Sequence, residues 1–72
     1  MKKTYKIEVD CANCAMKMEN LIQKIDGIKN ATVNFMMQKV ILDIDDAANV
    51  KKIMKEANRC VKKIDSDAEI YE

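Results

Sequence analysis

The sequence predicts a single α+β domain in which a strand–helix–strand unit occurs twice. The chain has 72 residues, which limits it to one compact core. Apolar residues alternate with polar ones in several short segments, as in strands with one buried face. Between these segments, apolar residues recur at i, i+3, i+4 and i+7, the spacing of an amphipathic helix. The order of the two patterns along the chain predicts the fold.

The first half of the chain contains the first unit. Alternation predicts a strand whose buried positions are Tyr5, Ile7 and Val9. A loop is expected over residues 10–13, followed by a helix from Cys14. The apolar stripe of this helix consists of Met18, Leu21, Ile22 and Ile25. Gly27 suits a left-handed helix cap, so the helix is expected to end near Asp26.

The second half repeats the same order of elements. Two strands are expected in succession, with Ala31, Val33 and Phe35 and then Val40, Leu42 and Ile44 as their apolar positions. The link over residues 36–39 is short, so the two strands are expected to form an antiparallel hairpin. Asp45 or Asp46 is expected to cap a second helix. The stripe of that helix consists of Val50, Ile53, Met54 and Ala57. A last strand is expected in the remainder, which contains Val61, Ile64 and Ile70.

Two such units pack compactly in the ferredoxin-like βαββαβ arrangement. We therefore expect a four-stranded antiparallel sheet with both helices on one face, in one domain that spans residues 1–72. The helix stripes would cover that face, and the other face would stay in contact with solvent.

The composition excludes several classes of function. Thirteen basic and 12 acidic residues give a net charge of +1, so no nucleic-acid footprint is expected. No segment approaches the roughly 20 apolar residues of a membrane span, and no apolar signal segment follows Met1. The chain has no His, which excludes Ser-His and Cys-His nucleophile pairs. A monomeric binding domain is expected rather than an enzyme.

The segment with distinctive chemistry is Asp10-Cys11-Ala12-Asn13-Cys14. Two thiols at this spacing, in a loop that opens a helix, can turn towards one point. Cys14 would lie in the first helical turn, where the helix dipole favours the thiolate. Paired thiolates bind soft or borderline cations such as Cu(I), Zn(II) and Cd(II). The same spacing also occurs in redox enzymes and in structural zinc sites.

This segment and two others resemble the heavy-metal-associated (HMA) domain, a soluble module of metal-transporting P-type ATPases and small metallochaperones. The other two are Ile25-Asp26-Gly27-Ile28 at the helix exit and Ala31-Thr32-Val33-Asn34-Phe35 in the second strand. The resemblance implies the fold expected above. It also implies that Cys11 and Cys14 bind a metal ion and pass it to a partner by ligand exchange. A membrane metal-transporting ATPase, in the same chain or another, is the expected partner, and the expected location is cytoplasmic.

The residues before the first cysteine bear on the choice of metal. Copper-binding members of the family usually have Met two positions before it and Thr directly before it, where this chain has Val9 and Asp10. An Asp at this position resembles the zinc, cadmium and lead branch. A carboxylate oxygen also suits Zn(II), which takes about four ligands. Asp10 is therefore the expected third ligand, and Zn(II) the expected metal, with Cd(II) and Pb(II) as competitors.

Cys60 is a further candidate ligand. By alignment it occupies the position where copper-binding members often have Tyr or Phe, in a loop after the second helix that lies beside the metal loop. The fold would return it to the same end of the sheet, so it is a candidate additional thiolate. The competing interpretation is a packed residue at the end of the helix. Met36 and Met37, in the hairpin, are expected to lie far from the metal loop.

The sequence leaves three alternative functions. A Cu(I) or Hg(II) carrier would use the same two thiols. A thiol-disulfide redox protein is disfavoured because the chain has no Pro, which a thioredoxin-like site usually places opposite its thiols. A plain interaction module of the same fold is disfavoured by the paired cysteines.

Overall fold

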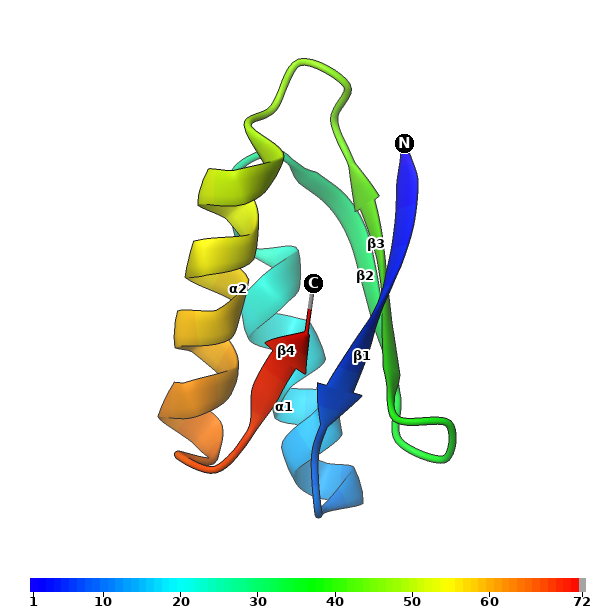
Figure 1. Cartoon of the computed structure of the whole chain (residues 1–72), viewed down its shortest axis with the longest axis vertical. Coiled ribbons are helices and arrows are strands. Elements are labelled where there is room, and N and C mark those ends of the chain that lie inside the picture. The colour runs from blue at the N-terminus through cyan, green and yellow to red at the C-terminus, as the bar shows by residue number, and fades with distance from the viewer. Residues whose placement is uncertain (72) are drawn as a thin grey trace.

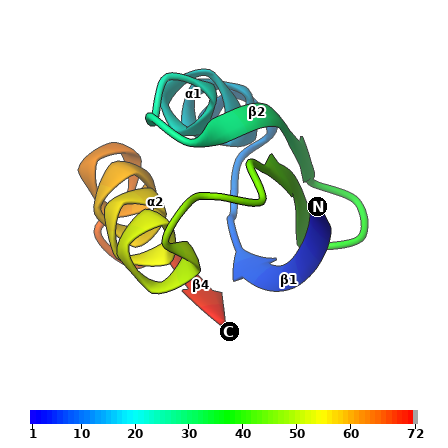
Figure 2. The same cartoon turned by 90° about the horizontal axis from the view of Figure 1, so that it is seen from above.

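The computed structural model describes residues 1–71 and has the expected βαββαβ order. Its elements are β1 (Lys2–Glu8), α1 (Ala12–Gln23), β2 (Ile28–Asn34), β3 (Lys39–Ile44), α2 (Val50–Ile64) and β4 (Glu69–Tyr71). The strands form one sheet in the order β2-β3-β1-β4, and every neighbouring pair is antiparallel. Both helices lie on the same face of this sheet (Figure 1, Figure 2). The predicted ferredoxin-like fold is confirmed.

The core lies between the two helices and the sheet, where the predicted apolar positions meet. Its largest completely buried side chains are Ile7, Met18, Ile22, Val40, Leu42, Ile44, Met54 and Val61. Burial of one such side chain stabilises the fold by roughly 1.5–3 kcal/mol. Met18 and Met54 therefore have a packing role, as their places on the helix stripes predict. The opposite face of the sheet is open, and Ile41 on β3 is 37% exposed there.

The outer edge of β2 is bound by side chains of α1. Glu19 Oε1 accepts a hydrogen bond from the Val33 N–H at 2.8 Å, and Gln23 Nε2 donates to the Ala31 carbonyl at 2.9 Å. Unpaired backbone groups on an edge strand are a template for pairing with another chain. The two side chains occupy such groups and fix α1 against β2.

The first helix is displaced from its expected bounds. It begins at Ala12 rather than Cys14, and Cys11 is its N-cap, with extended backbone at φ −138°. It ends at Gln23, one turn earlier than expected. Gly27 has the expected left-handed backbone, with φ +97°, but it lies in the turn beyond the C-cap and leads into β2.

The prediction that Asp45 or Asp46 caps the second helix is wrong. Asn49 is the N-cap, and its side chain accepts a hydrogen bond from the Lys52 N–H. Asp45 instead accepts from the Ala47 N–H at 3.1 Å and so closes the preceding turn. Asp and Asn suit both positions, which is why composition alone does not separate a cap from a turn.

The assignment of Val61 and Ile64 to the last strand is also wrong. Both belong to α2, where they continue the stripe of Ala57 at the i+4 and i+7 positions. The last strand is reduced to Glu69–Tyr71, which pairs with β1 through the partners Ile7 and Ile70. Within residues 1–71, neither helix has the length and apolar character needed to cross a membrane.

Candidate metal centre

The candidate metal loop, residues 10–14, connects β1 to α1 at one end of the molecule (Figure 1). Val9 is buried before the loop, and Asp10 is exposed at its start. Cys11 follows as the N-cap of α1, and its carbonyl accepts a hydrogen bond from the Ala15 N–H at 2.9 Å. Cys14 lies in the first helical turn. Both cysteines are free and half-exposed, so an ion or a partner can reach them.

The two thiols are close enough to influence each other. The backbone N–H of Cys14 and then its thiol lower the pKa of Cys11, although no ordinary capping hydrogen bond forms there. The interaction with the Cys11 thiol, followed by burial and the negative charges of Cys11 and Asp65, raises the pKa of Cys14. Lys17, one turn along α1, favours the thiolate at both cysteines.

The expectation that the helix start favours a thiolate at Cys14 is therefore wrong. The helix start favours it at Cys11. The unpaired N–H groups of a first turn point back towards the side chain of the N-cap residue, and Cys11 is that residue. The N–H groups of Cys14 and Asn13 both lower the pKa of Cys11.

The structure brings Cys11 and Cys14 together at the start of α1. Among the described residues, 1–71, no group of three or more His, Cys, Asp or Glu is close enough to hold a metal ion. Asp10 is adjacent to Cys11 in the chain, but it points into solvent rather than completing such a group. Its role as a third ligand stays a prediction.

Cys60 lies inside α2, not in a loop after it. Its side chain is half-buried and packs against the hydrophobic core. Burial raises the pKa of Cys60, and the charged groups that act on it are Lys63, Glu56 and Arg59, all on its own helix. At neutral pH this residue is therefore a thiol, as a packed cysteine is expected to be.

Asp65 is a residue that the sequence reasoning missed. It is the C-cap of α2, where its N–H donates to the Val61 carbonyl at 3.0 Å and its Oδ1 accepts from the Asp67 N–H at 3.0 Å. Its charge raises the pKa of Cys14. Figure 1 shows the reason, since the end of α2 lies at the same end of the molecule as the start of α1. In the sequence Asp65 is one of several acidic residues near the C-terminus, and no pattern marks it as the one that acts on Cys14.

The turn between β2 and β3 is hydrogen-bonded to the residue that precedes the metal loop. Met36 and Met37 at its tip are 87% and 61% exposed. The next residue, Gln38, makes hydrogen bonds to the backbone of Val9, which precedes Asp10. The separation of Met36 and Met37 from the two cysteines stays a prediction.

The fold and the paired cysteines agree with one family of proteins. The family model described as "Heavy-metal-associated domain" matches residues 4–66. The chain belongs to this family. The match includes the complete metal loop, both helices and the first three strands except for the start of β1.

Similar HMA sequences occur in metal transporters. The chain is 38% identical over 48 residues to a cadmium, zinc and cobalt-transporting ATPase of Helicobacter pylori, which covers 67% of this chain and 7% of the ATPase. It is 33% identical over 58 residues to the periplasmic component of a mercuric transport protein of Shewanella putrefaciens. This match covers 76% of this chain and 64% of the mercuric protein. The chain thus spans a small part of the ATPase and less than two thirds of the mercuric protein.

Solved HMA structures have the same fold. The CopZ metallochaperone superimposes with a TM-score of 0.74 at 20% identity, over 99% of this chain and 100% of that chain. The N-terminal domain of a potential copper-translocating P-type ATPase from Bacillus subtilis gives a TM-score of 0.70 at 30% identity, over 96% of this chain and 84% of that domain. The N-terminal domain of the zinc(II) ATPase ZiaA gives a TM-score of 0.74 at 14% identity, over 99% of this chain and 63% of that chain. Proteins whose names include Cu(I) and proteins whose names include zinc(II) thus share this fold.

Proposed function

We propose that this HMA domain binds one divalent soft metal ion through Cys11 and Cys14 and exchanges it with a metal-transporting P-type ATPase. Zn(II) is the proposed ion, with Cd(II) and Pb(II) as competitors. The observation that carries the proposal is the pairing of two free, half-exposed thiols at the start of α1. Thiolates are strong ligands for all three ions.

The negative charge around the thiols favours a divalent ion. Asp10 is next to Cys11 in the chain, and Asp65 acts on Cys14 from the end of α2. Two thiolates and one carboxylate carry three formal negative charges, which suit Zn(II) better than Cu(I). We assign the third ligand to Asp10, whose exposed side chain is able to turn towards the metal.

Two thiolates and one carboxylate give Zn(II) three ligands, whereas it usually takes four. An incoming thiolate from a partner is then able to bind before an outgoing thiolate leaves. This property suits a domain that passes its ion on. The named functions of two relatives, a cadmium, zinc and cobalt-transporting ATPase and a zinc/cadmium/lead-transporting P-type ATPase of Escherichia coli, support such a partner. A cytoplasmic location is part of the same proposal.

Cu(I) transport is the second candidate, and one observation favours it. Cu(I) is satisfied by two thiolates, and within residues 1–71 the two cysteines have no third ligand beside them. The 30% identity to the domain of a potential copper-translocating ATPase from Bacillus subtilis is in agreement.

A competition titration of the reduced domain tests the proposal. Chromogenic chelators would report the affinities for Zn(II) and Cu(I) in the absence of oxygen. We expect Asp10→Asn to weaken Zn(II) binding about tenfold, at the lower end of the effect of residues around a metal site, and to leave Cu(I) binding unchanged. Asp26→Asn is the matched control, because Asp26 is exposed beyond the other end of α1. Equal effects of the two variants would contradict the role of Asp10.

A further variant addresses Cys60. We expect Cys60→Ser to leave both affinities unchanged, since Cys60 packs against the core from inside α2. A loss of Zn(II) affinity in this variant, without a loss of stability, would make Cys60 a ligand.

A further inference from the structure

Gln38 connects the β2–β3 hairpin to the residue that precedes the metal loop. Its Oε1 accepts a hydrogen bond from the Val9 N–H at 2.9 Å, and its Nε2 donates to the Val9 carbonyl at 2.9 Å. The same Nε2 donates to the Phe35 carbonyl at 2.8 Å, within the hairpin turn. The backbone carbonyl of Gln38 accepts from the Ile7 N–H at 3.0 Å. Gln38 thus makes three hydrogen bonds to Ile7 and Val9, at the end of β1, and a fourth within its own turn.

These bonds replace strand pairing where it ends. β1 ends at Glu8, and its ladder with β3 reaches Lys6 opposite Lys39. Val9 lies beyond the ladder, yet it is only 3% exposed. A buried backbone N–H and carbonyl need partners. The Gln38 carboxamide supplies both, so Val9 is held as if it still lay in a sheet.

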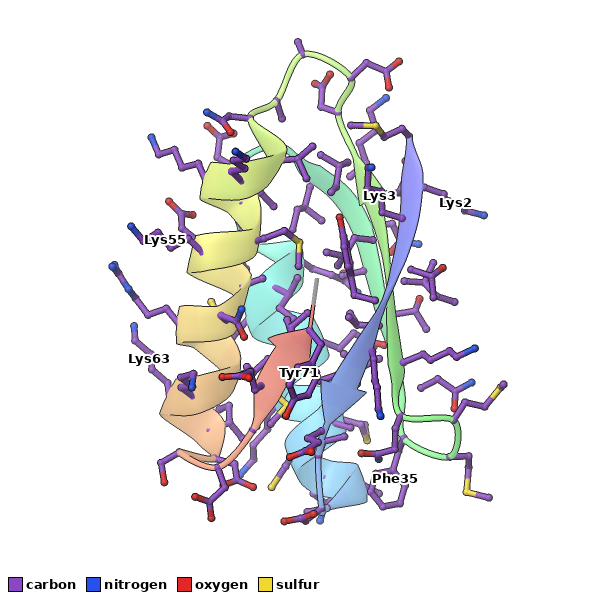
Figure 3. The ribbon with its side chains drawn as sticks, in the orientation of Figure 1. Lys2, Lys3, Phe35, Lys55, Lys63 and Tyr71 are labelled. Atoms are coloured by element: carbon purple, nitrogen blue, oxygen red, sulfur yellow. The ribbon has the colours of Figure 1, made fainter. Side chains whose placement is uncertain are left out.

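The backbone conformation of Gln38 indicates that its side chain has a structural role. Gln38 has φ +53°, a left-handed conformation in which a non-glycine residue is disfavoured and a glycine is not. The three hydrogen bonds of the carboxamide offset that cost. Figure 3 places Phe35, the first residue of this turn, at the end of the molecule where α1 begins.

We propose that Gln38 is the positioning residue of the metal loop. By fixing both backbone groups of Val9, it sets the place and direction from which Asp10 and Cys11 leave the sheet. Without the carboxamide, Val9 would lose its partners and the two cysteines would sample more than one separation. The effect on metal binding rests on the proposed function, whereas the effect on Val9 does not.

The replacement Gln38→Gly separates positioning from stability. It removes the carboxamide, but it also removes the backbone cost of the left-handed conformation, so the loss of global stability is limited. Gln38→Glu is the intermediate variant, because it keeps an acceptor for the Val9 N–H but replaces the donor to the Val9 and Phe35 carbonyls by a carboxylate oxygen. Gln23→Ala is the matched control, since it removes a carboxamide bond to the Ala31 carbonyl of β2, remote from the loop in sequence.

Two measurements on the reduced protein test the proposal. In the metal-free state, amide exchange at Val9 is expected to accelerate at least tenfold in Gln38→Gly, to accelerate less in Gln38→Glu and to stay protected in Gln23→Ala. Competition with a chelator is expected to show weaker Cd(II) binding in Gln38→Gly, by about tenfold, with a smaller effect in Gln38→Glu and none in Gln23→Ala. Unchanged exchange at Val9, or faster exchange with unchanged Cd(II) affinity, would overturn the proposal. If the unaltered protein binds no Cd(II), the proposed function fails, and exchange at Val9 alone decides the role of Gln38.

Discussion

The backbone N–H of Cys14, and then its thiol, lower the pKa of Cys11, whereas the interaction with the Cys11 thiol raises the pKa of Cys14. The thiolate is the form that reacts with electrophiles and binds metals. As the pH rises from neutral, Cys11 is therefore the first of the two to become reactive.

Alkylation measures this order directly. With iodoacetamide over a series of pH values, followed by peptide mass spectrometry, we expect Cys11 to be modified before Cys14. The reactivity of Cys11 should appear below the ordinary pH range of a free thiol, and that of Cys14 above it. Cys60, half-buried and with a raised pKa, should react slowly. Modification of Cys14 before Cys11 would contradict the arrangement of the loop.

Asp65→Asn should lower the pKa of Cys14 towards its ordinary value. The negative charge of Asp65 favours the protonated thiol, and the amide removes that charge. Asn keeps an oxygen that accepts from the Asp67 N–H, so the turn should persist. Titration of the Cys14 Cβ resonance by NMR would measure the shift. Asp67→Asn is the control for a general charge effect, and an equal shift in both variants would argue against a specific role of Asp65.

Gly27→Ala should destabilise the fold by about 1–3 kcal/mol. Gly27 has φ +97°, and an added Cβ would lie 2.9 Å from Ile53 Cδ1 and 3.1 Å from Ala48 Cβ. Urea unfolding would measure the change in free energy. Ile53→Val removes the Cδ1 atom, so the double variant should recover the part of the loss caused by this contact. A loss below about 0.5 kcal/mol would show that the turn adapts without strain.

Asn58→Ala should open the outer edge of β4. The Asn58 carboxamide accepts from the Ile70 N–H at 2.7 Å and donates to the Ile70 carbonyl at 3.2 Å. Its loss should cost about 1–3 kcal/mol and speed amide exchange at Ile70. Asn20→Ala, an exposed asparagine on α1, is the control. If exchange at Ile70 is the same in both variants, Asn58 does not protect this edge.

The order of the elements was predictable because two periodicities alternate clearly along the chain. Their bounds were harder to predict where both periodicities fit. Val61 and Ile64 were expected in the segment that supplies the last strand, but they continue the apolar stripe of α2. The first helix begins two residues before its predicted start, because its N-cap is Cys11, which is not a residue type typical of that position.

The cysteine pair was predictable from its spacing, but its surroundings were not. The preference for a thiolate at Cys11 depends on the direction of two N–H groups, which no residue pattern encodes. Asp65 and Gln38 reach the loop from other elements, and Gln38 is 29 positions from Val9 in the chain. Contacts of this kind depend on the register of the sheet and on the packing of α2.

A Cd(II) titration of the fully reduced domain, followed by ultraviolet thiolate-to-metal charge transfer, tests the central claim most directly. We predict a sharp endpoint at one Cd(II) per chain, with a band amplitude of two thiolates that is lost in Cys11→Ser and in Cys14→Ser. The absence of a saturable band, or a band that survives both replacements, would contradict a metal site at the start of α1.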